Sequence, residues 1–85
     1  MAWTVIYPPK AEKDLERLGV NLAKKVILKM DEIALDPYNL LDKMVNSPYY
    51  KFRIGEYRGI VDIVNDKLIL IVVKIKHRSQ VYKKI

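Results

Sequence analysis

The stretch from Tyr50 to Lys76, YKFRIGEYRGIVDIVNDKLILIVVKIK, determines most of the expected sheet. Its first five residues alternate between apolar and basic side chains, which is the two-residue period of a β-strand with one buried face. Gly55-Glu56 suits a tight hairpin turn because glycine comes first, and Asn65-Asp66 is a second turn signal. These turns divide the stretch into three expected antiparallel strands, at 50–54, 57–64 and 68–75. The last is a nearly continuous run of β-branched residues and leucine, which predicts a central strand buried on both faces.

The residues before this stretch predict one strand and two helices. The expected elements are a strand at 2–7, helices at 10–18 and 21–35, and a loop at 38–48. Alternation marks the strand, and apolar residues every three or four positions mark the helices. Gly19 is expected at the turn of a helical hairpin, with Asn21 as the N-cap of the second helix. The order of elements predicts an α+β fold in one domain, residues 1–85, with both helices on one face of a largely antiparallel sheet.

Charge is unevenly distributed along the 85 residues. The chain has a formal net charge of +6, with 16 Lys and Arg against 10 Asp and Glu. Residues 1–42 hold six bases and seven acids, a net charge of −1, whereas residues 43–85 hold ten bases and three acids, a net charge of +7. This asymmetry favours a polyanionic partner, either nucleic acid or an acidic protein. An excess kept only for solubility would be spread more evenly.

Strand alternation places these charges on one face of the expected sheet. The helices should cover the face that carries Phe52, and Tyr50 and Tyr57 share its phase, so both tyrosines are expected in the core. The opposite face should collect the polar residues of the strands. These are Lys51, Arg53 and Arg58, with Lys74 or Lys76 near the end of the last strand.

The inventory of catalytic residue types is small. The chain has no Cys, one His, two Ser and one Thr, so neither a nucleophilic triad nor a Cys-based zinc site is expected. Its three glycines form no phosphate-binding loop, and no cofactor is expected. The remaining Arg, Lys and Tyr side chains can hold a phosphodiester and stabilise a pentacovalent transition state. RNA suits such a set because its 2′-hydroxyl is an internal nucleophile beside the phosphorus.

Two motifs resemble those of a known superfamily. Residues 50–63, YKFRIGEYRGIVDI, are followed by an apolar strand and then by HRSQVY at 77–82. Together with the order of the other elements, they resemble the RelE/ParE superfamily of toxin–antitoxin toxins, RelE-like branch, over the whole chain. The resemblance implies a microbial-ribonuclease-like fold. For RelE-like members it also implies metal-free cleavage of mRNA in the ribosomal A site by 2′-hydroxyl attack.

The resemblance implies roles for individual residues as well. Lys51 matches the strand lysine near the nucleophile, and Arg58 matches the arginine that stabilises the transition-state phosphate. Arg78 would supply a second phosphate contact, and Tyr82 would stack on a base or assist proton transfer. The further RNA contacts expected are Arg53, Lys76, His77 and the helix bases Lys10, Lys13 and Arg17. Alternatively, the helix bases contact no RNA and only form a solvated face of the helix.

The partners that the resemblance implies are a cognate RelB-like antitoxin, which wraps the toxin, together with the ribosome and mRNA. No membrane partner is expected, because no apolar stretch approaches the length of a membrane span. Absence of cysteine suits a reducing compartment, so we expect a cytoplasmic protein. Two alternatives stay open: a ParE-like toxin that inhibits DNA gyrase, and a catalytically inactive RNA-binding member of the same fold.

Overall fold

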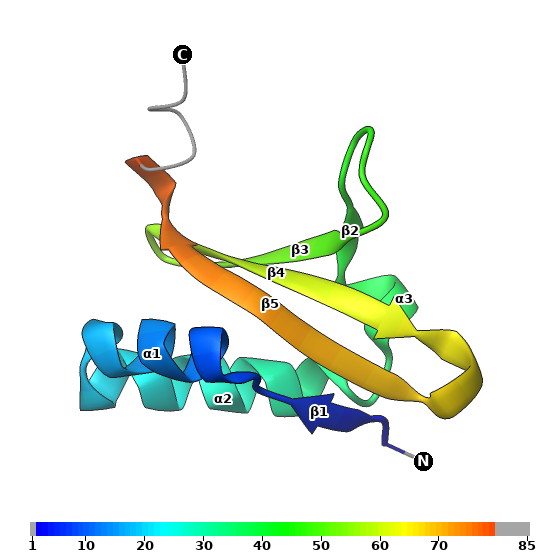
Figure 1. Cartoon of the computed structure of the whole chain (residues 1–85), viewed down its shortest axis with the longest axis horizontal. Helices are drawn as coiled ribbons and strands as arrows, with labels where there is room; N and C mark the ends of the chain where they lie inside the picture. Colours follow the sequence, from blue (N-terminus) through cyan, green and yellow to red (C-terminus); the bar gives the residue numbers. More distant parts are fainter. Residues whose placement is uncertain (1, 80–85) are drawn as a thin grey trace.

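The fold is built on a five-stranded sheet, and two helices lie along one side of it (Figure 1). The computed structural model describes residues 2–79. In chain order the elements are β1 (Thr4–Ile6), α1 (Pro9–Leu18), α2 (Val20–Ile33), α3 (Pro37–Leu40), β2 (Asp42–Lys43), β3 (Tyr50–Ile54), β4 (Tyr57–Val64), a 3₁₀ turn η1 (Asn65–Lys67) and β5 (Ile69–His77). The strand order is β1-β5-β4-β3-β2, with β1 parallel to β5 and the other neighbours antiparallel. The predicted α+β fold, with a strand, a helical hairpin and a three-strand meander, is confirmed.

Several details of the strands and loops differ from the sequence prediction. The segment 38–48, expected as a loop, contains β2 and most of α3. The first strand is limited to three residues, because only Thr4–Ile6 has partners in β5. β5 pairs with β1 on one side and β4 on the other, so it is an interior strand, as predicted. Residues of β5 are buried on one face and half-buried on the other, so the prediction of burial on both faces is wrong.

Gly19 forms the turn of the helical hairpin. Its φ of 89° lies in a region that side chains of other residues rarely adopt. Its N–H donates to the Glu16 carbonyl at 3.3 Å, and its carbonyl accepts the Ala23 N–H at 3.0 Å. Gly19 therefore takes the N-cap position of α2 itself, and the helix begins one residue before the predicted cap at Asn21.

The core lies between the helices and the sheet. Val26, Met30 and Ile33 of α2 are each at most 1% exposed. The strands contribute Phe52, Val61, Leu70, Val72 and Ile75, with Tyr50 and Tyr57 packed against them as predicted. Asp14 of α1 is also buried, at 7% exposure, and among residues 2–79 it is the only charged side chain that is buried to this extent. A buried carboxylate is stable only where hydrogen-bond donors or cations surround it.

A β-bulge in β5 determines which of its residues face away from the helices. The register between β4 and β5 shifts by one residue at Val73, which has no partner. Before the bulge the even-numbered Val72 is buried, and after it the odd-numbered Ile75 is buried. Because the phase reverses, both Lys74 and Lys76 lie on the face opposite the helices, where the sequence predicted one or the other.

A close cross-strand contact joins β3 and β4 on the core side. Phe52 pairs directly with Gly59. A Cβ atom at position 59 would lie 2.2 Å from the Phe52 ring, so the ring occupies the space of a side chain. Glycine is therefore required at this position by packing.

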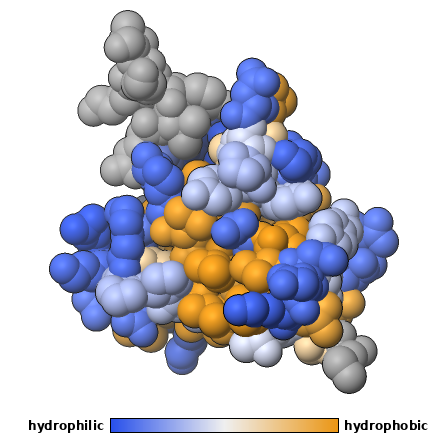
Figure 2. Space-filling model, turned by 45° about the vertical axis from the view of Figure 1, so that its right-hand side comes forward, coloured by the Kyte–Doolittle hydropathy of each residue, from blue (hydrophilic) through white to orange (hydrophobic). Residues whose placement is uncertain are grey.

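The outer surface combines apolar and polar residues. In a view turned by 45° from Figure 1, hydrophobic residues gather in the middle of the visible face and hydrophilic residues surround them (Figure 2). Small domains routinely expose apolar side chains, so this feature does not by itself mark a site. Among residues 2–79, no helix combines the length and the apolar character that crossing a bilayer requires.

Candidate nucleic-acid interface

Basic side chains form two cross-strand rows on the sheet face opposite the helices. In the first row, Arg53 of β3 pairs with Arg58 of β4, which pairs with Lys76 of β5. In the second row, Lys51 of β3 pairs with Ile60 of β4, which pairs with Lys74 of β5. Directly paired residues point to the same face of a sheet. We call Lys51, Arg53, Arg58, Lys74 and Lys76 the basic face. The placement predicted for Lys51, Arg53 and Arg58 is confirmed, and both Lys74 and Lys76 join them.

The first row places like charges directly opposite one another. Neighbouring strands are about 4.8 Å apart, so Arg53, Arg58 and Lys76 follow closely across three strands. Like charges in this arrangement destabilise a sheet. Local violations of folding rules of this kind are expected at functional sites, where a ligand provides the missing charge. The row therefore favours an anionic ligand.

A groove of about 280 Å³ opens on the basic face. Lys51, Arg53 and Arg58 line it together with Asp42 and Phe52. Asp42 pairs with Lys51 across β2 and β3, which leaves the two arginines without an acid in their own row. Cations around one opening can hold a phosphate through charge-assisted hydrogen bonds.

Lys74 is a residue of this face that was not among the predicted site residues. The neighbouring Lys76 charge lowers the pKa of Lys74, and partial burial lowers it further. Strand alternation alone had indicated its face, although not its interaction with Lys76.

Arg78 lies just past β5, beside the turn between β3 and β4. Its backbone N–H donates to the Glu56 carbonyl at 2.6 Å, and its Nη1 is 3.9 Å from Oε1 of the Glu56 carboxylate. Both side chains are exposed, and exposed ion pairs are weak. The Arg78 guanidinium can therefore exchange this carboxylate for a phosphate.

His77 lies on the helix side of the sheet, unlike Lys76. Its ring meets the Tyr57 ring edge-on at a centroid distance of 5.0 Å. Ser79 donates its backbone N–H to Nδ1 at 3.1 Å, and Ser79 Oγ is 2.8 Å from the same nitrogen. Since Nδ1 accepts a backbone hydrogen bond, we assign the proton of the neutral ring to Nε2. The two neighbours in the predicted RNA-binding set thus face opposite sides.

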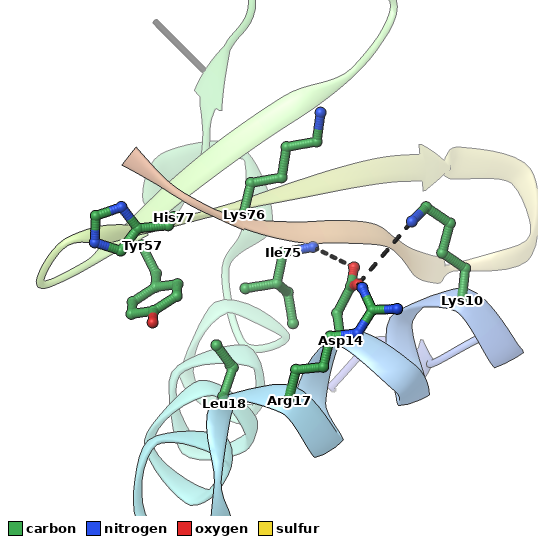
Figure 3. A pocket seen from close by; sticks show the side chains of 8 residues that line it. All are labelled: Lys10, Asp14, Arg17, Leu18, Tyr57, Ile75, Lys76 and His77. Carbon is green, nitrogen blue, oxygen red and sulfur yellow. Dashed lines mark hydrogen bonds and ion pairs between the residues drawn. The ribbon is translucent and has the colours of Figure 1, made fainter. Parts of the chain in front are cut away.

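A notch of about 360 Å³ lies between α1 and β5 (Figure 3). Its polar lining includes Lys10, Asp14, Arg17 and Lys76, and we call it the α1–β5 notch. Asp14 Oδ2 accepts the Ile75 N–H at 3.0 Å. Asp14 Oδ1 is 4.0 Å from Lys10 Nζ and 3.9 Å from Arg17 Nη1. The buried Asp14 carboxylate therefore connects α1 to the edge of β5 and lies close to two cations.

The remaining predicted residues fall outside these two sites. Lys13 lines a neighbouring hollow together with Lys10 and Arg17. Tyr82 lies outside the described residues. Asp14 was not predicted, although its place on the apolar stripe of α1, three residues after Ala11, is the signal that marks it. Within residues 2–79, no group of three or more His, Asp and Glu gathers in a way that could hold a metal ion.

Comparison with known proteins identifies the family. A family model described as the ParE toxin of type II toxin-antitoxin system, parDE, matches residues 5–82. The chain belongs to this family. The RelE/ParE superfamily predicted from the two motifs is therefore confirmed, and the protein is a toxin of a type II toxin–antitoxin system. A search of curated proteins finds no match.

Solved structures that contain RelE share the fold of this ParE-family toxin. A chain of the RelBE2 toxin–antitoxin complex of Mycobacterium tuberculosis superposes with a TM-score of 0.81 at 18% identity, covering 92% of this chain and 100% of that chain. A chain of the RelE–RelB complex of Pyrococcus horikoshii gives 0.79 at 20% identity, over 94% and 99%. A mutant E. coli RelE in the free state gives 0.78 at 20% identity, over 99% and 94%. At these identities the likeness shows the fold.

Proposed function

We propose that this toxin is a ribosome-dependent mRNA endonuclease, which cleaves in the A site by metal-free 2′-hydroxyl attack. The observation that carries the proposal is the row of Arg53, Arg58 and Lys76, directly opposite one another across three strands. Guanidinium groups match the geometry of phosphate oxygens. Because negative charge on the phosphate increases in the transition state, these cations stabilise that state more than the bound substrate.

The reaction requires one bond to form and one to break at phosphorus. The 2′-hydroxyl loses its proton as its oxygen bonds to phosphorus, and the 5′-oxygen leaves and takes up a proton, which gives a 2′,3′-cyclic phosphate and a 5′-hydroxyl. In this proposal Lys51 acts near the nucleophile, and Arg58 binds the non-bridging oxygens. Lys74 is on the same face as Lys51 and supplies a further positive charge there. Arg78 supplies a second phosphate contact, and Tyr82 stacks on a base or assists proton transfer.

The proposed partners are a RelB-like antitoxin, the ribosome and mRNA, in the cytoplasm. Similar folds in Mycobacterium tuberculosis and Pyrococcus horikoshii were solved in toxin–antitoxin complexes. A net charge of +6 suits both RNA and an acidic antitoxin. An antitoxin that covers the basic face, or displaces an element supporting it, would suppress cleavage.

Inhibition of DNA gyrase is the second candidate function. It is favoured by the description of the matching family, which is named for ParE. Measuring ribosomal cleavage beside inhibition of purified gyrase distinguishes the two candidates.

The test compares cleavage by the wild-type toxin and three variants on programmed ribosomes, with the mRNA ends mapped. Arg58→Ala is expected to slow codon-phased cleavage about 10²–10³-fold, the effect of losing one donor to the transition state. Tyr82→Phe tests the terminal tyrosine. Lys25→Ala removes an exposed base of α2 and is the matched control, with cleavage expected at the wild-type rate.

Three results would contradict the proposal. If Arg58→Ala cleaves at the wild-type rate, the basic face takes no part in the reaction. Absence of cleavage together with inhibition of purified gyrase would establish the second candidate. Ribosome binding without cleavage or gyrase inhibition would identify a catalytically inactive RNA-binding member of the fold.

A further inference from the structure

The cations of the basic face continue around the edge of the sheet toward α1. β1 pairs with β5 only at residues 69–71, and beyond this point the edge of β5 packs beside α1. Lys76 belongs both to the basic face and to the rim of the α1–β5 notch. In Figure 3 the Lys76 side chain leaves β5 on the side away from α1, while Lys10 extends from the helix toward the strand. A band of positive charge therefore connects Arg58, Lys76 and α1.

The charges in this band are close enough to affect one another. The pKa of Lys74 is lowered chiefly by Lys76, then by partial burial and by Lys10, whereas Asp14 raises it. Repulsion among cations is relieved when an anion binds between them. The electrostatic interaction thus extends from the basic face to the helix side of the notch.

The helix cations in the notch remain available to a ligand. Lys10 and Arg17 have side-chain exposures of 66% and 77%. Their distances of 4.0 and 3.9 Å to Asp14 Oδ1 exceed the hydrogen-bond range, so these pairs are electrostatic only. Each head group therefore keeps N–H donors for another acceptor. A phosphate brings both the charge and the acceptor oxygens that these groups can use.

Asp14 fixes the geometry of the notch. Its hydrogen bond to the Ile75 N–H attaches α1 to the edge of β5, immediately before Lys76. The same carboxylate attracts Lys10 and Arg17 to the mouth of the notch. Asp14 does not itself favour an anion, because its charge repels one.

We propose that the α1–β5 notch is a second anion site, which binds a backbone phosphate of the RNA that flanks the cleaved bond. Lys10 and Arg17 contact this phosphate, Lys76 lies on the rim of the notch toward the basic face, and Asp14 is the positioning residue that holds α1 against β5. The identity of the RNA rests on the proposed function. RNA is favoured over an acidic peptide because the band is continuous with the basic face, so a single polyanion can occupy both sites and gain affinity from the linkage.

The test measures binding of a 2′-O-methylated single-stranded RNA to the full-length toxin at several KCl concentrations. This RNA lacks the 2′-hydroxyl nucleophile, so binding is measured without cleavage. Lys10→Ala/Arg17→Ala is expected to weaken binding about tenfold and, because one phosphate is no longer neutralised, to reduce the salt slope by about 0.7. The matched control, Lys24→Ala/Lys25→Ala, removes two bases from α2 and is expected to change affinity by at most about twofold.

Asp14→Asn separates positioning from charge. The amide oxygen can still accept the Ile75 N–H, so the fold is retained, but the negative charge beside the bound phosphate is absent. The same RNA is therefore expected to bind about threefold more tightly, because the Asp14 charge that repels the phosphate close to solvent is gone. Weaker binding in Asp14→Asn, with an unchanged thermal midpoint, would contradict the proposed position of the phosphate.

The Ile75 amide is a local probe of the notch in ¹⁵N–¹H spectra. The RNA is expected to shift its resonance in the wild-type toxin and not in Lys10→Ala/Arg17→Ala. The proposal is overturned if the two double variants weaken binding equally, or if the RNA leaves Ile75 unchanged. A shift of Ile75 with hexaglutamate but not with RNA would also overturn it and identify a protein-docking site. Failure of ribosomal cleavage alone would refute the proposed function and leave this binding result standing.

Discussion

Gly59→Ala is expected to destabilise the toxin through one contact. A Cβ atom at position 59 would lie 2.2 Å from Cε1 and 2.3 Å from Cζ of Phe52. Carbon atoms in packed side chains approach to about 3.5–4.0 Å, so the ring has to move by about 1.3 Å or more. Phe52 is 5% exposed and packs in the core, which leaves little room for such a shift.

The magnitude follows from two opposing effects. Overpacking a core of this kind costs about 1–3 kcal/mol of the free energy of unfolding. Replacing a strand glycine by alanine returns about 0.5–1 kcal/mol, because the unfolded chain loses freedom. The difference between the two effects is a net loss of up to about 2.5 kcal/mol, with a midpoint of about 1 kcal/mol. At about 4–8 °C per kcal/mol for a domain of this size, a loss of about 1 kcal/mol lowers the thermal midpoint by about 4–8 °C.

The assay is chemical denaturation of Gly59→Ala alone and combined with Phe52→Leu. Leucine lacks the ring edge that meets position 59, so in that background the alanine should cost less than about 0.5 kcal/mol. Gly55→Ala is the control: its φ is 54° and no atom lies within 4 Å of the added Cβ, so about 1 kcal/mol of backbone strain should appear in both backgrounds. An equal cost of Gly59→Ala with phenylalanine and with leucine at position 52 would rule out the ring as the cause.

Three further predictions concern titration and burial. Burial raises the pKa of Tyr7 to about 12, so the free energy of unfolding should fall as pH rises from about 10 to 12. Tyr7→Phe removes a buried hydroxyl that has no partner among the described residues. Denaturation at several pH values should show that this variant no longer has the loss. Lys76→Met should raise the pKa of Lys74 toward its ordinary value, because the Lys76 charge is the main cause of its lowering; NMR titration of the lysine side chains would detect it. Asp14→Ala should cost about 1–3 kcal/mol in urea denaturation, since the Ile75 N–H loses its acceptor, whereas Asp14→Asn should cost less.

The meander was predictable because residues 50–54 alternate, residues 68–75 form a nearly continuous apolar run, and the turns between the strands carry glycine, asparagine and aspartate. α3 and β2 were not, because four helical and two extended residues are too few to show a period. The bulge has a signal that strict alternation overlooks. Val72 and Lys74 have the same parity but opposite environments, so a phase reversal between them is the only way to keep the lysine out of the core.

Asp14 illustrates why the candidate site was only partly predictable. Acids on amphipathic helices usually face water, and the partner here is a backbone N–H 61 residues away, which no local pattern reveals. Lys51, Arg53 and Arg58 were predictable because their place depends on strand alternation alone. The opposite orientations of Lys76 and His77 follow from the same rule.

The hydrogen bond between Asp14 and Ile75 also protects an open strand edge. β5 extends six residues beyond Ile71, the last residue that pairs with β1, and an unpaired edge is a template for association with a second chain. The buried carboxylate occupies one of the N–H groups that such a chain would need, and α1 lies alongside the edge. Any extended peptide that joins the sheet here first has to displace Asp14. The residue that shapes the notch therefore also opposes edge-to-edge aggregation of the toxin.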